Sequence, residues 1–170
     1  GVPCQGFSLN NRKRHKNDDR NLLYKEFVRI IKELQPKAIV LENVSGMKST
    51  GNFVSEIEKD LSSAGNMKVK SKLLNAADYG VPQNRKRLFF VGVIDVDFDF
   101  DEVISTHGPG LEPYNTIRDA IGDLPSLKPK ETSKKYAKPA SSNYQKLMRL
   151  NSTEFECHTA PNHPIETINR

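Results

Sequence analysis

The stretch KAIVLENV, residues 37–44, decides the fold class of this chain. Its apolar residues follow one another without a charge, from Ala38 to Leu41, and the run ends in a polar pair, Glu42 and Asn43. A short continuous apolar run of this kind is typical of a strand that is buried on both faces of a sheet. We therefore predict a buried strand with Glu42 at its carboxyl end, where ligands collect in an α/β sheet.

Amphipathic patterns on both sides of this run predict helices that cover the strand. Before it, apolar residues at helical spacing predict a helix that ends before Pro36; they are Leu23, Phe27, Ile30, Ile31 and Leu34. After it, a second stripe predicts a helix that Gly65 ends; its members are Phe53, Val54, Ile57 and Leu61. Strand patterns follow in MKVKSKLL, residues 67–74, and in RLFFVGV, residues 87–93. This alternation indicates an α/β fold with flanking helices.

The pattern is weaker beyond residue 93. The acidic run DVDFDFDE, residues 95–102, is expected on the surface, and NTIRDAIGDLPSL, residues 115–127, predicts one short helix. KPKETSKKYAKPA, residues 128–140, has the composition of a basic linker. No core pattern is visible after about Leu127, so we expect the tail to need a partner or a further segment in order to fold.

Composition bounds the classes of function. The 170 residues suit one domain, and the net charge of +5 suits a polyanionic partner such as nucleic acid, although it is also common in ordinary enzymes. The two cysteines, Cys4 and Cys157, lack CxxC spacing, which favours a reducing, intracellular setting over a disulfide framework. We expect no membrane span and no signal peptide.

The first residues display a thiol. In PCQGFS, residues 3–8, Pro3 biases Val2 toward an extended backbone and Gly6 permits a sharp turn or a close ligand. Cys4 is therefore expected where a strand gives way to a loop, which is a setting for a reactive cysteine. A buried, inert cysteine is the alternative.

Three stretches, taken together, resemble a known family. PCQGFS at residues 3–8, ENV at 42–44 and QNRKR at 83–87 occur in the order and at the separations found in the cytosine-5 DNA methyltransferases. The likeness covers roughly residues 1–94. It implies a partial Rossmann-like, S-adenosylmethionine-dependent methyltransferase fold with a mixed sheet and flanking helices. Residues 1–127 would form the C-terminal half of the catalytic domain, and residues 128–170 a basic linker and the start of the target-recognition region.

The resemblance assigns catalytic roles. C5 of cytosine is a poor nucleophile, so a thiolate must first attack C6, and Cys4 would supply it. Glu42 would hold the proton needed at N3, which burial at a strand end would favour. Arg87 would hold the cytosine O2, while Arg85 and Gln83 would brace the site or nearby phosphates. Arg85 and Arg87 are two residues apart, so they point the same way on an extended segment. A surface carboxylate and a pair of solvated cations are the alternatives for these motifs.

The same resemblance implies the partners. The target cytosine must leave the duplex, so double-stranded DNA is the expected partner, with Gln83 and the loop cations Arg12, Lys13 and Arg14 near the phosphates. S-adenosylmethionine is the expected methyl donor, with Gln5, Ser8 and Leu23 as candidate contacts. We expect no metal, because the spacing of Cys157, His158 and His163 matches no usual zinc site.

Alternatives to this function remain open. The family's glycine-rich donor-binding segment has no counterpart in the chain, so we expect the central portion of an enzyme, cytoplasmic or nucleoid-associated, from a bacterial restriction-modification system. It could be an inactive fragment, or a subunit that a complementary chain completes. A tRNA-directed member of the same family and a catalytically silent DNA-binding module are the other hypotheses.

Overall fold

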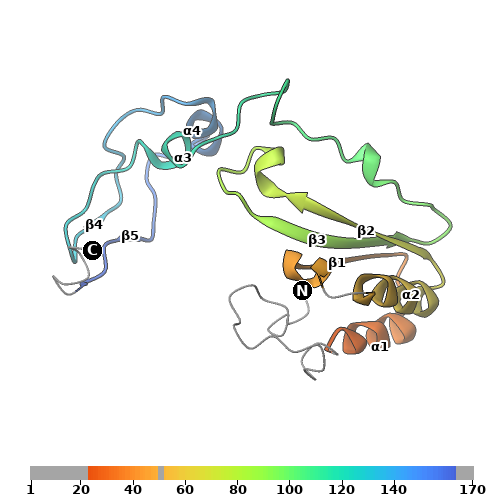
Figure 1. The fold of residues 1–170 in the computed structure, drawn as a ribbon. Helices are drawn as coiled ribbons and strands as arrows, with labels where there is room; N and C mark the ends of the chain where they lie inside the picture. Colours follow the sequence, from red (N-terminus) through yellow and green to blue (C-terminus); the bar gives the residue numbers. More distant parts are fainter. Residues whose placement is uncertain (1–22, 50–51, 164–170) are drawn as a thin grey trace.

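The computed structural model describes residues 23–49 and 52–163. Helices α1 (Tyr24–Leu34) and α2 (Phe53–Gly65) lie on one face of a sheet, as Figure 1 shows. The strands of this sheet are β1 (Ala38–Val44), β2 (Lys68–Asn75) and β3 (Lys86–Val93), in the order β1-β3-β2. Strand β3 runs antiparallel to both neighbours. The predicted α/β fold is confirmed, and each of these elements lies where the sequence pattern predicts it.

The register of β1 against β3 decides which side chains face the helices. Leu41 lies opposite Phe90 and both are buried, whereas Val40, which has the other orientation, is 63% exposed. The prediction that β1 is buried on both faces is therefore wrong for the described part of the chain. An apolar run shows that a strand is apolar, and it does not show how many faces other elements cover.

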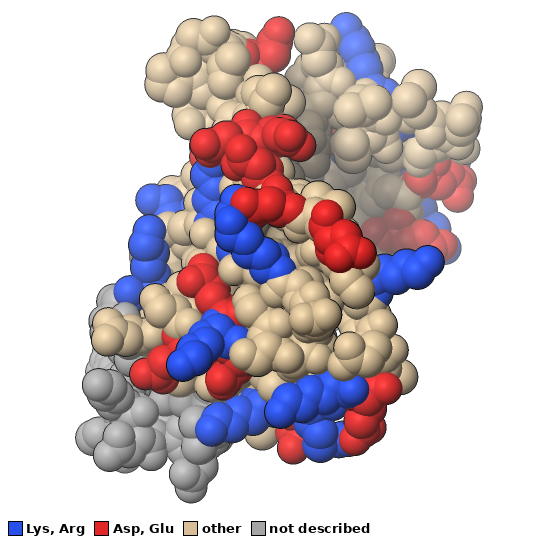
Figure 2. All heavy atoms as spheres, turned by 90° about the vertical axis from the view of Figure 1, so that its right-hand side faces the viewer, with Lys and Arg blue, Asp and Glu red and all other residues tan. Residues whose placement is uncertain are grey.

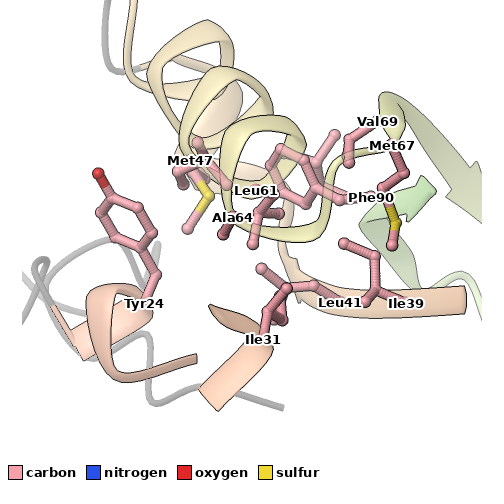
Figure 3. Packing of buried hydrophobic residues seen from close by; sticks show 12 residues of the cluster. Tyr24, Ile31, Ile39, Leu41, Met47, Leu61, Ala64, Met67, Val69 and Phe90 are labelled. Atoms are coloured by element: carbon pink, nitrogen blue, oxygen red, sulfur yellow. The ribbon is translucent and has the colours of Figure 1, made fainter. Parts of the chain in front are cut away.

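The core lies between the sheet and the two helices. Side chains from α1, α2 and the strands converge there, as Figure 3 shows, and Phe90, Ile57 and Leu61 have no measurable exposure. The core face of α1 differs from the predicted stripe: Tyr24 and Ile31 are buried with Phe27 and Val28 beside them, whereas Ile30 and Leu34 are exposed. The prediction omitted the tyrosine and the valine, and the true stripe is rotated by about one residue.

Tyr24 combines an apolar ring with a polar tip. Its ring meets Phe53 edge to face at 5.5 Å, and its hydroxyl donates a 2.8 Å hydrogen bond to the Asp60 carboxylate of α2. The pKa of the Tyr24 phenol is raised, mainly because the phenol is buried and also because of this hydrogen bond. Tyr24 therefore ties α1 to α2 by packing and by a directed bond.

The end of α2 differs from the prediction in one residue. Asn66, with φ at 49°, takes the left-handed position that caps the helix, and Gly65 is the last helical residue. A Cβ on Gly65 would lie 2.7 Å from Cε of Met67 and 3.3 Å from Cγ2 of Ile31. Gly65 thus lies close to Met67 and to Ile31 of α1, and the asparagine supplies the turn.

The acidic segment 95–102 returns along the outer edge of the sheet. Asp97 pairs with Lys68 and Lys70 at 2.6 and 2.8 Å, and Asp101 pairs with Lys72 at 2.9 Å. Hydrogen bonds from these lysines lower the pKa of both aspartates. Acidic and basic side chains lie next to one another on this side of the molecule, as Figure 2 shows. The expected surface position is confirmed, except that Phe100 is buried.

A second group of elements follows. It comprises α3 (Ile117–Ile121), α4 (Asn143–Met148) and a short pairing of β4 (Thr132–Ser133) with β5 (His158–Thr159). The side chain of Asp123, at 1% exposure, receives two 3.0 Å hydrogen bonds from the Arg149 guanidinium. Helix α3 was predicted, whereas α4 and this buried ion pair were not. Beyond Phe100, the buried residues of the described chain are the polar Asp123 and Gln145, so this group is ordered by polar contacts and has no buried apolar cluster.

Among the described residues, no helix combines the length and the apolar character that crossing a bilayer requires.

Truncation of Phe90 tests the one-sided core. We expect Phe90→Ala to lower the free energy of unfolding by about 3–5 kcal/mol, because it leaves a cavity in the packed layer. Val40→Ala on the opposite face should change it by less than about 0.5 kcal/mol. Urea denaturation followed by circular dichroism measures both, and a large loss in Val40→Ala would mean that the second face is covered.

Removal of Arg149 tests the second group. Arg149→Met should lower the free energy of unfolding of this group by about 3 kcal/mol, because the Asp123 carboxylate stays buried without its partner. The amides of Ala137 and Lys138, which donate to the Asp123 backbone oxygen, should then exchange faster with solvent in hydrogen-exchange experiments. Unchanged exchange would contradict a structural role for the ion pair.

Candidate active site

Glu42 and Arg87 meet on the face of the sheet opposite α1 and α2. Glu42 lies opposite Phe89 in the β1–β3 register, and Arg87 lies two residues before Phe89 on the same face. Nε of Arg87 is 2.8 Å from Oε1 of Glu42. The Arg87 side chain is 23% exposed and the Glu42 side chain is 39% exposed, so Glu42 is less buried than the sequence led us to expect. The pairing of two strands thus brings together two of the predicted site residues.

A pocket of about 310 Å³ opens beside this ion pair. Glu42, Arg85 and Arg87 supply its charged side, and the remaining lining is mainly apolar: Leu74, Ala76, Tyr79, Phe89 and Val103. A concave site with an apolar wall and a few convergent polar groups is the usual form of a small-ligand site. Its acceptor and donor groups could orient a flat polar ring against an aromatic wall.

The loop before β3 places Arg85 at the same pocket. The backbone oxygen of Arg85 accepts a 3.0 Å hydrogen bond from the amide of Ala76, and this bond closes the loop between β2 and β3. Arg85 and Arg87, which their two-residue spacing predicts to point the same way, both line this pocket. They also line an adjoining hollow of about 450 Å³, whose other lining residues are Ser45, Gln83, Asn84 and Lys86.

Asn43 has a structural part in this region. Its side chain is buried, and its Oδ1 accepts a 2.8 Å hydrogen bond from the amide of Val44, at the point where β1 gives way to the 3₁₀ helix η2 (Ser45–Ser49). The Asn43 side chain therefore stabilises the turn that follows the strand.

The other predicted site residues are distributed as follows. Leu23 lies just before α1 and is 39% exposed, and it does not line the pocket. Gln83 lines the adjoining hollow. Six further residues lie outside the described part of the chain: Cys4, Gln5, Ser8, Arg12, Lys13 and Arg14.

Sequence reasoning missed the apolar wall of the pocket. Phe89 had a local signal, because it alternates with Leu88 and Phe90 and so shares the face of Arg87. Tyr79 and Val103 had none, since each reaches the pocket from a separate loop segment.

Within residues 23–49 and 52–163, no three histidine, cysteine, aspartate or glutamate side chains are grouped so that they could hold a metal ion. His158 instead forms a 2.8 Å hydrogen bond to the backbone oxygen of Pro125.

Comparison with known proteins defines the family. The family model for C-5 cytosine-specific DNA methylases matches residues 1–163. The chain is 46% identical to the type II methyltransferase M.BspRI of Lysinibacillus sphaericus over 134 residues, which is 76% of this chain and 31% of that protein. It is 36% identical to M.DdeI of Desulfomicrobium norvegicum over 177 residues, which covers 100% of this chain and 42% of that protein.

A solved structure agrees with these relatives. It is described as a DNA modification methyltransferase encoded within a prophage of E. coli, and it superposes with a TM-score of 0.60 at 29% identity. The match covers 85% of this chain and 41% of that one. The chain belongs to the C-5 cytosine-specific DNA methylase family. It spans less than half the length of each of these three proteins.

Loss of the Glu42 charge should barely affect folding. We expect Glu42→Gln to lower the free energy of unfolding by at most about 1 kcal/mol, because the ion pair with Arg87 is partly exposed to water. Glu33→Gln, which breaks an exposed ion pair with Arg29, is the control. Urea denaturation measures both variants. A much larger loss in Glu42→Gln would show that the carboxylate is needed to hold the sheet together.

Proposed function

We propose that this chain carries the catalytic residues of a DNA cytosine-5 methyltransferase. The observation that carries the proposal is the convergence of Glu42, Arg85 and Arg87 on one pocket with an aromatic wall, in a chain of the C-5 cytosine methylase family. The family match supports DNA as the substrate, and the pocket supports a flat heterocyclic ring as the group that is bound.

In this proposal Cys4 and Glu42 act on the cytosine from two sides. The Sγ thiolate of Cys4 forms a bond to C6, and the displaced ring electrons make C5 nucleophilic. Glu42 supplies the proton at N3, and Arg87 donates hydrogen bonds to O2. C5 would then take the methyl group of S-adenosylmethionine as the sulfonium–methyl bond of that donor breaks. Loss of the protons at C5 and N3 to solvent and cleavage of the Sγ–C6 bond would restore the aromatic ring and the free thiolate. Arg87, 2.8 Å from Glu42, also orients that carboxyl group before a base enters.

We also propose how the chain holds DNA. Gln83 and Arg85 lie at the hollow that adjoins the pocket, where side chains of this kind can contact phosphates without reading bases. Arg12, Lys13 and Arg14 would add cations near the backbone, which would make binding sensitive to salt. Residues 1–127 would belong to the catalytic domain, and residues 128–170 would lead into the region that recognises the DNA sequence.

S-adenosylmethionine would supply the methyl group. Of the proposed contacts Gln5, Ser8 and Leu23, the structure describes Leu23. Its exposed apolar side chain at the start of α1 fits contact with a flat adenine ring. Gln5 and Ser8 would hydrogen-bond the polar part of the donor.

Methyl transfer with labelled donor tests this function. We expect incorporation into duplex DNA by a protein that contains this chain, and a loss of at least about 10³-fold in Cys4→Ser, because the hydroxyl is a far weaker nucleophile than a thiolate. Cys157→Ser is the matched control and should keep full activity.

Three results would contradict the proposal. Equal rates in wild type and Cys4→Ser would rule out the cysteine mechanism. Incorporation into tRNA in preference to duplex DNA would assign the chain to the RNA-directed alternative. Binding of duplex DNA without any methyl transfer would favour a silent binding module.

A further inference from the structure

A segment far from the catalytic motifs supports one wall of the pocket. We call residues 106–115 the brace, since they pack against the turn formed by the 3₁₀ helix η3 (Ala76–Tyr79) and Gly80. The amides of Thr106 and His107 both donate to the backbone oxygen of Asp78, at 2.9 and 3.0 Å. The Asn115 Nδ2 donates a 2.8 Å hydrogen bond to the oxygen of Gly80. The brace thus binds the carbonyl groups on both sides of Tyr79.

A side-chain bond adds to this attachment. The Tyr114 hydroxyl donates to Oδ1 of Asp78 at 3.1 Å, and this hydrogen bond raises the pKa of the Tyr114 phenol. The brace is itself folded back, because the amide of Gly108 donates to the oxygen of Glu112 and the amide of Glu112 donates to that of Thr106. Contacts inside the brace therefore hold its two ends together at the turn.

His107 lies at the centre of these contacts. Its Nδ1 is 2.8 Å from Oγ1 of Thr106, and its Nε2 is 3.2 Å from Nδ2 of Asn115. The Asn115 amide can donate one hydrogen to Gly80 and the other to the imidazole, which makes Nε2 the acceptor and leaves Nδ1–H to donate to Thr106. The imidazole thereby orients the asparagine that holds the turn.

The imidazole also packs directly on the turn. Gly80 has φ at 84°, and a Cβ at this position would lie 2.7 Å from Cε1 of His107. The left-handed backbone and the absence of a side chain let the ring lie against the glycine. Loss of the ring would remove the side-chain acceptor of the second Asn115 amide hydrogen and the packing of the ring against Gly80.

The turn carries part of the pocket. Tyr79, between the two bound carbonyl groups, lines the pocket, and its hydroxyl donates a 3.4 Å hydrogen bond to the backbone oxygen of Val103. The amide of Ala76, at the start of the turn, donates to the oxygen of Arg85. A displacement of the turn therefore shifts both Tyr79 and Arg85 relative to Glu42 and Arg87.

We propose that His107 is a positioning residue that holds Tyr79 and Arg85 in place for methyl transfer. The inference rests on the proposed function, because it assigns His107 a part in the same reaction. His107 does not line the pocket, so its effect passes through Asn115 and Gly80. The cations Arg12, Lys13 and Arg14, which the proposed function assigns to phosphates, belong neither to the turn nor to the brace, so catalysis should suffer more than DNA binding.

Steady-state kinetics of His107→Ala test this inference in the protein that shows methyl transfer. We expect kcat to fall by about tenfold or more, because small displacements of positioning groups are costly, while KM for DNA changes little. His107→Gln, whose amide can accept from Asn115 and donate to Thr106, should recover most of the lost rate. His158→Ala is the matched control, since it removes a hydrogen-bonded imidazole in β5, away from the turn.

Hydrogen exchange supplies a second readout that needs no substrate. The amides of Gly80 and Val81, which donate to the oxygens of Ala77 and Ala76, should exchange faster in His107→Ala and at the wild-type rate in His158→Ala. The inference is overturned if exchange and kcat are both unchanged in His107→Ala. It is also overturned if kcat falls only in step with global unfolding and His107→Gln restores nothing. A wild-type protein without methyl transfer would overturn the proposed function instead, and faster exchange in His107→Ala would still establish the brace.

Discussion

The antiparallel pairing of β1 with β3 is the constraint on which the rest of this site depends. It places Glu42 and Arg87 on one face, with Nε and Oε1 2.8 Å apart, while Leu41 and Phe90 occupy the core on the other. A slip of one residue would exchange the two faces and bury the charges against α1 and α2. The packing of the core and the geometry of the ion pair are therefore set by the same register. This explains how a partly exposed pair, which adds little stability, can still be held in one geometry.

The sequence was sufficient for those features that local pattern determines. The strands and both covering helices follow from apolar periodicity. The two-residue spacing of Arg85 and Arg87 predicted that they point the same way, and both line one pocket. The burial of Glu42 was overestimated, because an apolar run before a residue does not report which faces of the strand are covered. Tyr79, Val103 and the brace could not be found in this way, since their relation to Glu42 exists only after distant loops have packed.

The second group shows the same limit for another physical reason. Its order depends on polar interactions: the Asp123–Arg149 ion pair, the buried Gln145, and capping boxes at Thr116 and Ser142. A search for apolar periodicity overlooks such a group, because buried polar residues satisfy one another instead of forming an apolar stripe. Many of its large apolar side chains are exposed, for example Ile117 and Leu147.

The addition of a cysteine to a cytosine ring is the central claim, and covalent trapping measures it directly. Fluorine at C5 cannot leave as the proton does, so DNA that contains 5-fluorocytosine should retain the enzyme after methyl transfer. The digested adduct should show the added mass on the peptide that contains Cys4 and none on the peptide that contains Cys157. The absence of an adduct in the presence of donor, or an adduct on Cys157, would contradict this account.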